Sequence, residues 1–172
     1  MDDSISRVLA QWEKVWPELD VSPVAVIARM ARIRAIVEAE QTRVFSAAGI
    51  TQADFPVLAT LRRGAWPHRL THGQLADELG LTPGSITPRV DHLVRLGLVS
   101  RHNDSADGRV RWVGLTDEGL AAINTLIPQH LKLEAELLSG IDPERRERLA
   151  EDLRVLLLSL ELVRHSRPAT PA

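Results

Sequence analysis

The chain has 172 residues, a net charge of −2 and no cysteine. Its length suits one compact domain with extensions, and the lack of cysteine excludes thiol redox sensing, thiolate metal sites and disulfide bonds. No apolar run is long enough to span a membrane and the acidic N-terminus is unlike a signal peptide, so we expect a cytoplasmic protein with no membrane partner.

The N-terminal part of the chain predicts two helices. Residues 4–16 place their apolar side chains on one stripe, and Pro17 ends that helix. Ser22 followed by Pro23 has the pattern of an N-cap with a first-turn proline, which begins a long helix. Gly49 is a C-cap signal, so this long helix is expected to end at about residue 48.

Three shorter helices are predicted next. Residues 51–54 (TQAD) resemble a capping box with a short acid and precede an apolar helix. After a predicted loop over residues 64–70, residues 71–74 (THGQ) form a second capping box, and its helix ends at Gly80. A Thr-Pro pair begins the third helix, over residues 82–96.

The pattern changes from a helical to a strand period after Gly97. Residues 98–102 and 110–115 predict two β-strands, and the polar, Asp- and Gly-rich segment 103–108 predicts the turn between them. These three segments together indicate a β-hairpin of the wing type.

The C-terminal part of the chain predicts two further helices. The first begins at Thr116, runs to Gly140 and is kinked or interrupted at Pro128. The second runs from Asp142 to about residue 164. The predicted fold class is therefore mainly α with a small β-hairpin wing (α+β), that is, a winged helix-turn-helix with an N- and C-terminal helical dimerisation region.

We divide the chain accordingly into four predicted parts. Residues 1–50 hold the N-terminal helices of the dimerisation region, and residues 51–116 form the winged helix-turn-helix domain. Residues 117–165 hold the C-terminal helices of the dimerisation region, and residues 166–172 are a disordered tail. The last helix is apolar over too much of its circumference for one small domain to cover, which predicts a homodimer.

The two short helices before the hairpin carry the functional prediction. A helix-turn-helix places its second helix in the major groove of DNA, and a hairpin directly after it can reach the backbone or the minor groove. Residues 82–111 carry five arginines and three aspartates, whereas the rest of the chain is net negative. A local positive element on an acidic body is what binding to DNA phosphates requires.

A helical wheel separates the two faces of the predicted helix over residues 82–96. Ile86, Val90 and Leu93 share one stripe and are expected in the core, while Arg89 falls on the flank and points partly back toward the protein. Pro88 allows two alternatives: it kinks a helix that begins after Thr82, or Ser85 is the true N-cap and Pro88 lies in the first turn. The wheel leaves both open.

The residues around this helix resemble the MarR family of bacterial regulators. Residues 75–101 (LADELGLTPGSITPRVDHLVRLGLVSR) and 107–119 (DGRVRWVGLTDEG) carry the resemblance, which extends over nearly the whole chain. The resemblance implies a winged-helix homodimer that represses genes and is released by a small ligand. It also implies that Asp107 braces the wing and that Arg109 enters the minor groove.

One branch of this family responds to urate and has an extra N-terminal helix, and the chain is similar to it at three positions. Trp12, Arg63 and Arg89 match the ligand and relay positions of that branch. A fourth position, an aspartate in the branch, is Pro56 here. The resemblance implies a small planar, anionic aromatic effector, and Pro56 at the fourth position favours another planar anion over urate.

The predicted contacts fall into two sets. The ligand-binding residues are Trp12, Arg63 and Arg89. The DNA-binding residues are Ser85, Thr87, Pro88, Asp91, His92, Arg95, Asp107, Arg109 and Arg111. We assign no catalytic or metal-ligating residue and expect no cofactor, because the chain has no phosphate-binding glycine loop, nucleophile motif or catalytic acid pair.

The expected partners follow from these sets. They are double-stranded DNA with a pseudo-palindromic operator, a second copy of the chain and a small-molecule effector. The alternative is a winged-helix module that binds a protein instead of DNA. The arginines of residues 82–111 argue against it, because protein interfaces tend to exclude charge from their centre.

Overall fold

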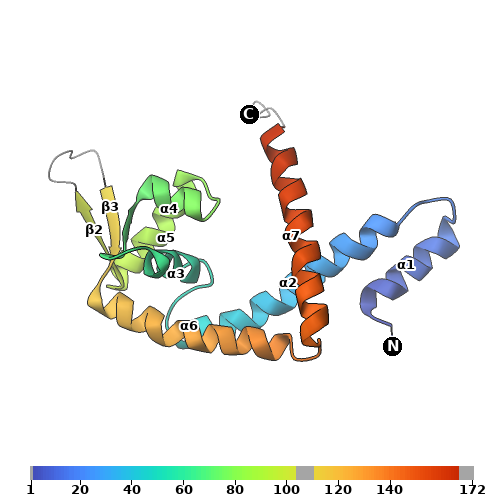
Figure 1. Ribbon diagram of the computed structural model, residues 1–172, viewed down its shortest axis with the longest axis horizontal. Coiled ribbons are helices and arrows are strands. Elements are labelled where there is room, and N and C mark those ends of the chain that lie inside the picture. Colours follow the sequence, from blue (N-terminus) through green and yellow to red (C-terminus); the bar gives the residue numbers. More distant parts are fainter. Residues whose placement is uncertain (1, 104–110, 167–172) are drawn as a thin grey trace. The chain divides into compact units, whose positions relative to one another are not determined.

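The computed structural model describes residues 2–103 and 111–166. It divides into two compact units, Met1–Leu133 and Glu134–Ala172 (Figure 1). The elements in these described ranges are, in chain order, α1 (Ser4–Val15), α2 (Ser22–Ala47), α3 (Phe55–Arg63), β1 (Arg69–Thr71), α4 (His72–Glu78), α5 (Pro83–Arg95), β2 (Val99–Asn103), β3 (Arg111–Leu115), α6 (Asp117–Leu137) and α7 (Pro143–Ser166). The predicted class, mainly α with a small β wing, is confirmed.

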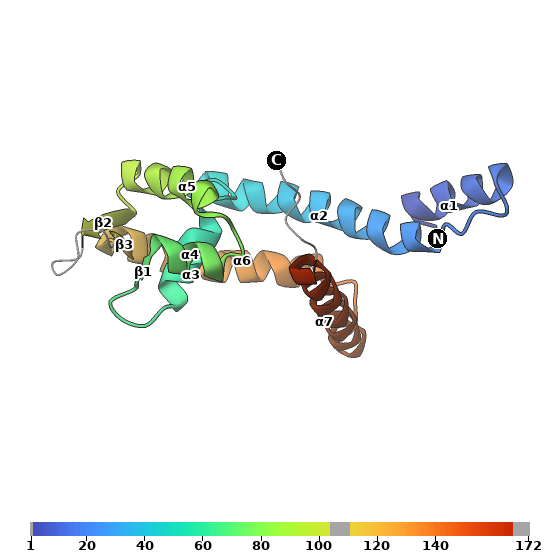
Figure 2. The ribbon, with the colours of Figure 1, turned by 90° about the horizontal axis from the view of Figure 1, so that it is seen from above.

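The two predicted N-terminal helices are present, and an ion pair joins them. The Asp3 carboxylate caps α1 by accepting from the Ser6 backbone N–H at 2.7 Å, and it also accepts from Arg29 Nε of α2 at 2.7 Å. Figure 2 shows α1 beside the N-terminal part of α2. The prediction of Ser22 as N-cap is off by one residue, because Ser22 is already helical and Val21 occupies the N-cap position. The Ser22 N–H donates instead to the Asp20 carboxylate at 2.9 Å.

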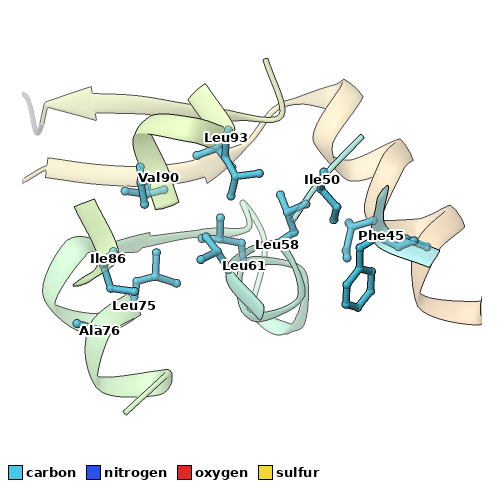
Figure 3. Packing of buried hydrophobic residues seen from close by; sticks show 14 residues of the cluster. Phe45, Ile50, Leu58, Leu61, Leu75, Ala76, Ile86, Val90 and Leu93 are labelled. Atoms are coloured by element: carbon cyan, nitrogen blue, oxygen red, sulfur yellow. The ribbon is translucent and has the colours of Figure 1, made fainter. Parts of the chain in front are cut away.

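The hydrophobic core lies between α3, α4, α5 and the sheet. Its buried apolar members are Phe45, Ile50, Val57, Leu58, Leu61, Leu75, Ala76, Ile86, Val90, Leu93, Val99, Val113, Ile123 and Leu126 (Figure 3). The end of α2 and the first half of α6 therefore contribute to the same core as the helix-turn-helix. This core fixes the orientation of α5, since three of its residues are buried there.

The sheet has three antiparallel strands in the order β1-β3-β2, one more than predicted. Residues 69–71 pair with β3, with Leu70 opposite Val113. The sequence predicts residues 69 and 70 as loop and Thr71 as the start of a capping box. On the other side of β3, Arg101 lies opposite the same Val113. The third strand therefore ties the entrance of α4 to the base of the hairpin.

The helix caps follow the sequence in one case and depart from it in another. Thr71 and Gln74 form the predicted capping box, with both reciprocal hydrogen bonds present. Only half of the expected box at residues 51–54 is formed, because α3 begins at Phe55 and the Thr51 hydroxyl is a donor to Asp54. The Asp54 carboxylate accepts from the Thr51 backbone N–H and hydroxyl, both at 2.7 Å.

The C-terminal helices are continuous. The helix α6 runs through Pro128, so the predicted interruption is wrong. In the second unit, Arg146 Nη2 donates to the Leu138 and Ile141 carbonyls at 3.1 and 3.2 Å and so holds the turn before α7. Residues 167–172 of the predicted tail lie outside the described residues. None of the described helices has the length and apolar character needed to cross a membrane.

Candidate nucleic-acid interface

A short turn connects α4 to α5 and sets the helix-turn-helix geometry. Gly80 adopts φ +61°, a left-handed conformation that glycine adopts without steric cost. The Leu81 N–H then donates back to the Ala76 carbonyl at 2.9 Å, which closes the end of α4. Thr82 lies in the N-cap position of α5 and Pro83 in its first turn, so the second helix starts at once (Figure 1).

The helix α5 presents one buried and one exposed face, as the wheel predicted. Ile86, Val90 and Leu93 are completely buried. Four of the predicted DNA-binding residues, Ser85, Thr87, Pro88 and Arg95, are exposed. The helix begins at Pro83 and contains Pro88 in its interior, so the alternative in which Ser85 is the N-cap is wrong.

Two further predicted DNA contacts of α5 are engaged with the protein itself. Asp91 is half-buried and forms an ion pair with Arg101 of β2. The His92 ring is half-buried, and its Nδ1 lies 2.9 Å from Oδ2 of the buried Asp54. Both side chains therefore fasten α5 to neighbouring elements, and the wheel could not show this because their partners come from β2 and from the turn before α3.

The structure describes only one of the three predicted DNA contacts in the hairpin. Arg111, the first residue of β3, is exposed. Asp107 and Arg109 lie outside the described residues. Sequence reasoning counted Arg101 in the local charge without giving it a contact, and it made no functional assignment for His72. Both line a groove of about 480 Å³ together with Thr71, Gly73, Pro83, Thr87 and Arg111.

A second cleft, of about 340 Å³, contains the predicted ligand residue Arg63. It is lined by Gln41, Phe45, Gln52, Phe55, Pro56, Ala59, Thr60, Arg63, Leu79 and His130. Phe45 and Phe55 stack with ring centroids 4.7 Å apart, and the His130 ring lies 4.4 Å from Phe55. The exposed Arg63 guanidinium donates to the Thr60 hydroxyl at 3.2 Å and lies 3.7 Å from the Glu78 carboxylate. The cleft thus combines aromatic rings with a cation.

The other two predicted ligand residues do not join this cleft in the described chain. Trp12 lies on α1, which packs against α2, and it is not among the lining residues. Arg89 points away from the exposed face of α5, as predicted, and its Nη1 lies 3.5 Å from the Ala53 carbonyl. The sequence could have suggested Phe45 and Phe55 in their place, since these are the only phenylalanines in the chain.

Comparison with known proteins gives consistent matches. A family model described as MarR family matches residues 48–110. The HTH-type transcriptional regulator PecS of Dickeya dadantii is 32% identical over 145 residues, which are 84% of this chain and 87% of that protein.

Two solved structures share the fold. One is Sco3205, a MarR family transcriptional regulator from Streptomyces coelicolor in complex with DNA, with TM-score 0.75, 22% identity and coverage of 88% of this chain and 91% of that one. The other is Bordetella bronchiseptica BpsR, whose DNA binding is regulated by 6-hydroxynicotinic acid, with TM-score 0.68, 20% identity and coverage of 77% and 98%.

Proposed function

The chain belongs to the MarR family of DNA-binding transcriptional regulators, and on this basis we propose that it is a dimeric repressor released from its operator by a small anionic aromatic ligand. Proteins of this family are transcription regulators rather than enzymes. The proposal places the chain in the branch with an extra N-terminal helix, supported by the presence of α1 before the long α2. The comparisons give no support to the alternative of a protein-binding module.

One observation carries the DNA-binding part of the proposal. The helix α5 buries Ile86, Val90 and Leu93 in the core while Ser85, Thr87 and Arg95 stay exposed, beside a hairpin that begins and ends in arginine-bearing strands. A second helix held in this way can enter the major groove with its polar face. We propose Ser85, Thr87, Pro88 and Arg95 of α5 and Arg111 of the hairpin as contacts, together with the undescribed Asp107 and Arg109.

Arginine substitutions test this face. We expect Arg95→Ala to weaken binding to an operator duplex by about 1–3 kcal/mol if the side chain contacts a base, or to lower the salt slope by about one unit if it contacts a phosphate. Arg109→Ala should behave in the same way. Arg89→Ala is the matched control and should bind unliganded DNA like the wild type, because Arg89 points to the Ala53 carbonyl. Fluorescence anisotropy over a salt series measures all three, and wild-type binding by both Arg95→Ala and Arg109→Ala would refute the assigned face.

The apolar surface of the terminal helices supports the dimer. In α7, Leu157, Leu160 and Leu162 are exposed although they are large and apolar, and in α2 Val26 and Ile27 are exposed as well. Exposed apolar surface of this kind is buried in symmetric homo-oligomers. We propose that residues 1–50 and 117–165 form this dimerisation region around the winged helix-turn-helix over 51–116.

Solution mass and footprinting test the dimer. Light scattering at micromolar concentration should give twice the chain mass. Footprinting should show a pseudo-palindrome whose half-sites lie about 10 base pairs apart, centre to centre. A monomer, or a single asymmetric half-site, would contradict this prediction.

The cleft around Arg63 is the proposed effector site. A planar anion suits it, because the Phe45 and Phe55 rings offer apolar surface and the guanidinium is a planar cationic fork. The turn over residues 51–54 connects this cleft to α5. Gln52 lines the cleft, while Arg89 and His92 of α5 reach Ala53 and Asp54. We therefore retain Arg89 as a relay residue. Trp12 of α1 remains a proposed contributor on the family resemblance alone, because it does not line the cleft in the described chain.

Release assays test the effector site. Urate, 6-hydroxynicotinate and hydroxybenzoates are the probes, and an active one should quench tryptophan fluorescence and release DNA. Arg63→Ala should bind DNA but need at least about tenfold more ligand for release, the loss expected when a charge-assisted hydrogen bond of about 1.5 kcal/mol or more is removed. Arg43→Ala, an exposed arginine of α2 paired with Glu40, is the control. Unchanged release of Arg63→Ala would place the site elsewhere, and Trp12→Phe tests the contribution of α1 separately.

A further inference from the structure

The groove between α4, α5 and the hairpin contains two of the proposed DNA contacts, Thr87 and Arg111, and further residues that have no assigned contact. Thr71 and Gly73 border it at the start of α4, Thr87 borders it on α5, and Arg101 and Arg111 border it on the two hairpin strands. It is an open groove of about 480 Å³. A phosphodiester with its flanking sugars is a ligand of suitable size and shape for such a groove, and backbone contacts make up half or more of protein–DNA hydrogen bonds.

The charge in this groove is positive and partly fixed in place. The ion pair with Asp91 of α5 holds the Arg101 guanidinium beside α5, and its side chain is 35% exposed. Arg111 is exposed on the neighbouring strand. The groove is therefore lined by two arginines, one of which, Arg101, is paired with the Asp91 carboxylate. A planar guanidinium binds phosphate oxygens through paired N–H groups.

His72 is the third titratable side chain that lines the groove, besides Arg101 and Arg111. Its Nδ1 is buried and has no hydrogen-bond partner among the described residues. The pKa of His72 is lowered from the ordinary 6.5, first by burial and then by Arg101 of β2 and Arg111 of β3, while Asp91 of α5 acts in the opposite direction. In the free protein at neutral pH the ring is therefore uncharged.

We propose that this groove seats one backbone phosphate of duplex DNA, held by Arg101 and Arg111, with His72 as a pH-dependent third contact. The inference rests on the proposed function and adds three residues, His72, Arg101 and Thr71, that the DNA-binding set lacks. In this proposal the ion pair with Asp91 has a function, because it positions the Arg101 guanidinium for the phosphate.

Binding of a backbone phosphate in this groove couples DNA binding to proton uptake by His72. A phosphate beside His72 offsets the field of the two arginines and stabilises the imidazolium, so the pKa of His72 is higher in the complex than in the free protein. A group whose pKa rises on binding strengthens binding at low pH. Affinity is therefore constant below the free-state pKa, falls as the pH rises between the two pKa values, and is constant again above the bound-state pKa. The fall is at most about tenfold per pH unit for each proton taken up.

The first experiment measures the proton linkage. The full-length wild type should bind a mixed-sequence DNA duplex with an affinity that falls as the pH rises from the free-state pKa of His72, which lies below 6.5, to its pKa in the complex. The NMR-determined pKa of His72 should rise when DNA is added. His72→Gln should bind DNA with a flat profile over this range. His102→Gln is the matched variant, since His102 lies on β2 next to Arg101, is not among the residues that line the groove, and has its Nε2 2.8 Å from the Ser100 hydroxyl. It should keep the wild-type profile. A profile that is lost in His102→Gln and kept in His72→Gln, or a pKa of His72 unmoved by DNA, overturns the proposal.

The second experiment counts phosphate contacts. Arg101→Gln and Arg111→Gln should each reduce the slope of log affinity against log salt by about one unit per protomer. Arg34→Gln, an exposed arginine of α2 that pairs with Glu38, should leave the slope unchanged. If Arg101→Gln and Arg111→Gln both keep the wild-type slope of log affinity against log salt, the proposed phosphate site is wrong.

Two further outcomes distinguish the phosphate seat from a general loss of DNA binding and from a site for a free anion. If the wild type binds no DNA at all, the proposed function fails as a whole, whereas DNA binding with unchanged slopes and pH profiles in the groove variants refutes only the seat. Inorganic phosphate is the probe for a free-anion site. Saturable shifts of the His72 signals by inorganic phosphate without DNA, absent in Arg101→Gln and accompanied by an unchanged DNA slope, would replace the backbone phosphate with a small anion.

Discussion

Replacing Gly119 by alanine is expected to destabilise the protein by about 3 kcal/mol or more, the range of severe overpacking in a site that cannot yield. A Cβ atom at Gly119 would overlap the backbone carbonyl of Leu98. The two segments cannot separate easily, because the Thr116 N–H donates to that same carbonyl at 3.2 Å. The Thr116 hydroxyl also donates to the Gly97 carbonyl at 2.7 Å and accepts from the Gly119 N–H at 3.0 Å.

Urea unfolding at one fixed protein concentration measures this effect, because a dimer's apparent stability depends on concentration. Gly84→Ala is the matched control. Gly84 also lies in a helix, but no atom lies within 4 Å of the Cβ that alanine would add. It should therefore be neutral or stabilise the protein by up to about 1 kcal/mol. Equal unfolding midpoints for the two variants would show that the contact of α6 with Leu98 does not constrain the fold.

Removal of the Asp54 carboxylate is expected to have the second largest effect, a loss of about 2–4 kcal/mol in the free energy of unfolding. Asp54 is 1% exposed, and its Oδ2 accepts from the Thr51 N–H, the Thr51 hydroxyl and His92 Nδ1 at 2.7, 2.7 and 2.9 Å. In Asp54→Ala these donors lose their acceptor inside the protein, and each unsatisfied buried group costs about 1–3 kcal/mol.

Two variants separate the hydrogen bonds from the rest of the effect. Asp54→Asn keeps an acceptor oxygen of the same shape and should lose distinctly less stability than Asp54→Ala. Asp142→Ala removes an exposed carboxylate that accepts only from the Arg145 N–H among the described backbone donors, and it should cost about 1 kcal/mol or less. If Asp54→Ala unfolds at the same urea concentration as Asp142→Ala, the buried contact between Asp54 and His92 does not stabilise α5.

The loss of Asp54 should also weaken DNA binding, since His92 and Asp54 fix α5 to the turn before α3. Under conditions where Asp54→Ala remains folded, circular dichroism monitors the folded fraction and anisotropy measures affinity. Wild-type affinity in the folded fraction would show that α5 keeps its orientation without this bond.

Around the helix-turn-helix the sequence by itself determined the order of the helices and the short turn between them, because those signals are local. The Thr71 and Gln74 capping box, the left-handed Gly80 and the Thr82-Pro83 pair each act within a few residues, and together they specify two helices joined by a short turn. The apolar period of α5 likewise identified its buried face, since a helical stripe depends only on spacing along the chain.

The tertiary structure decided what the flanking residues of those elements contact. A three-residue strand such as β1 has no period of its own and forms only because β3 offers it a free edge. From its position on the flank of α5, His92 could contact either solvent or the rest of the protein. It contacts the protein because the buried Asp54, 38 residues away in the sequence, lies within hydrogen-bond distance. Trp12, Arg63 and Arg89 stay apart in the described chain for the same reason: the packing of distant segments, which no local pattern encodes, places each of them.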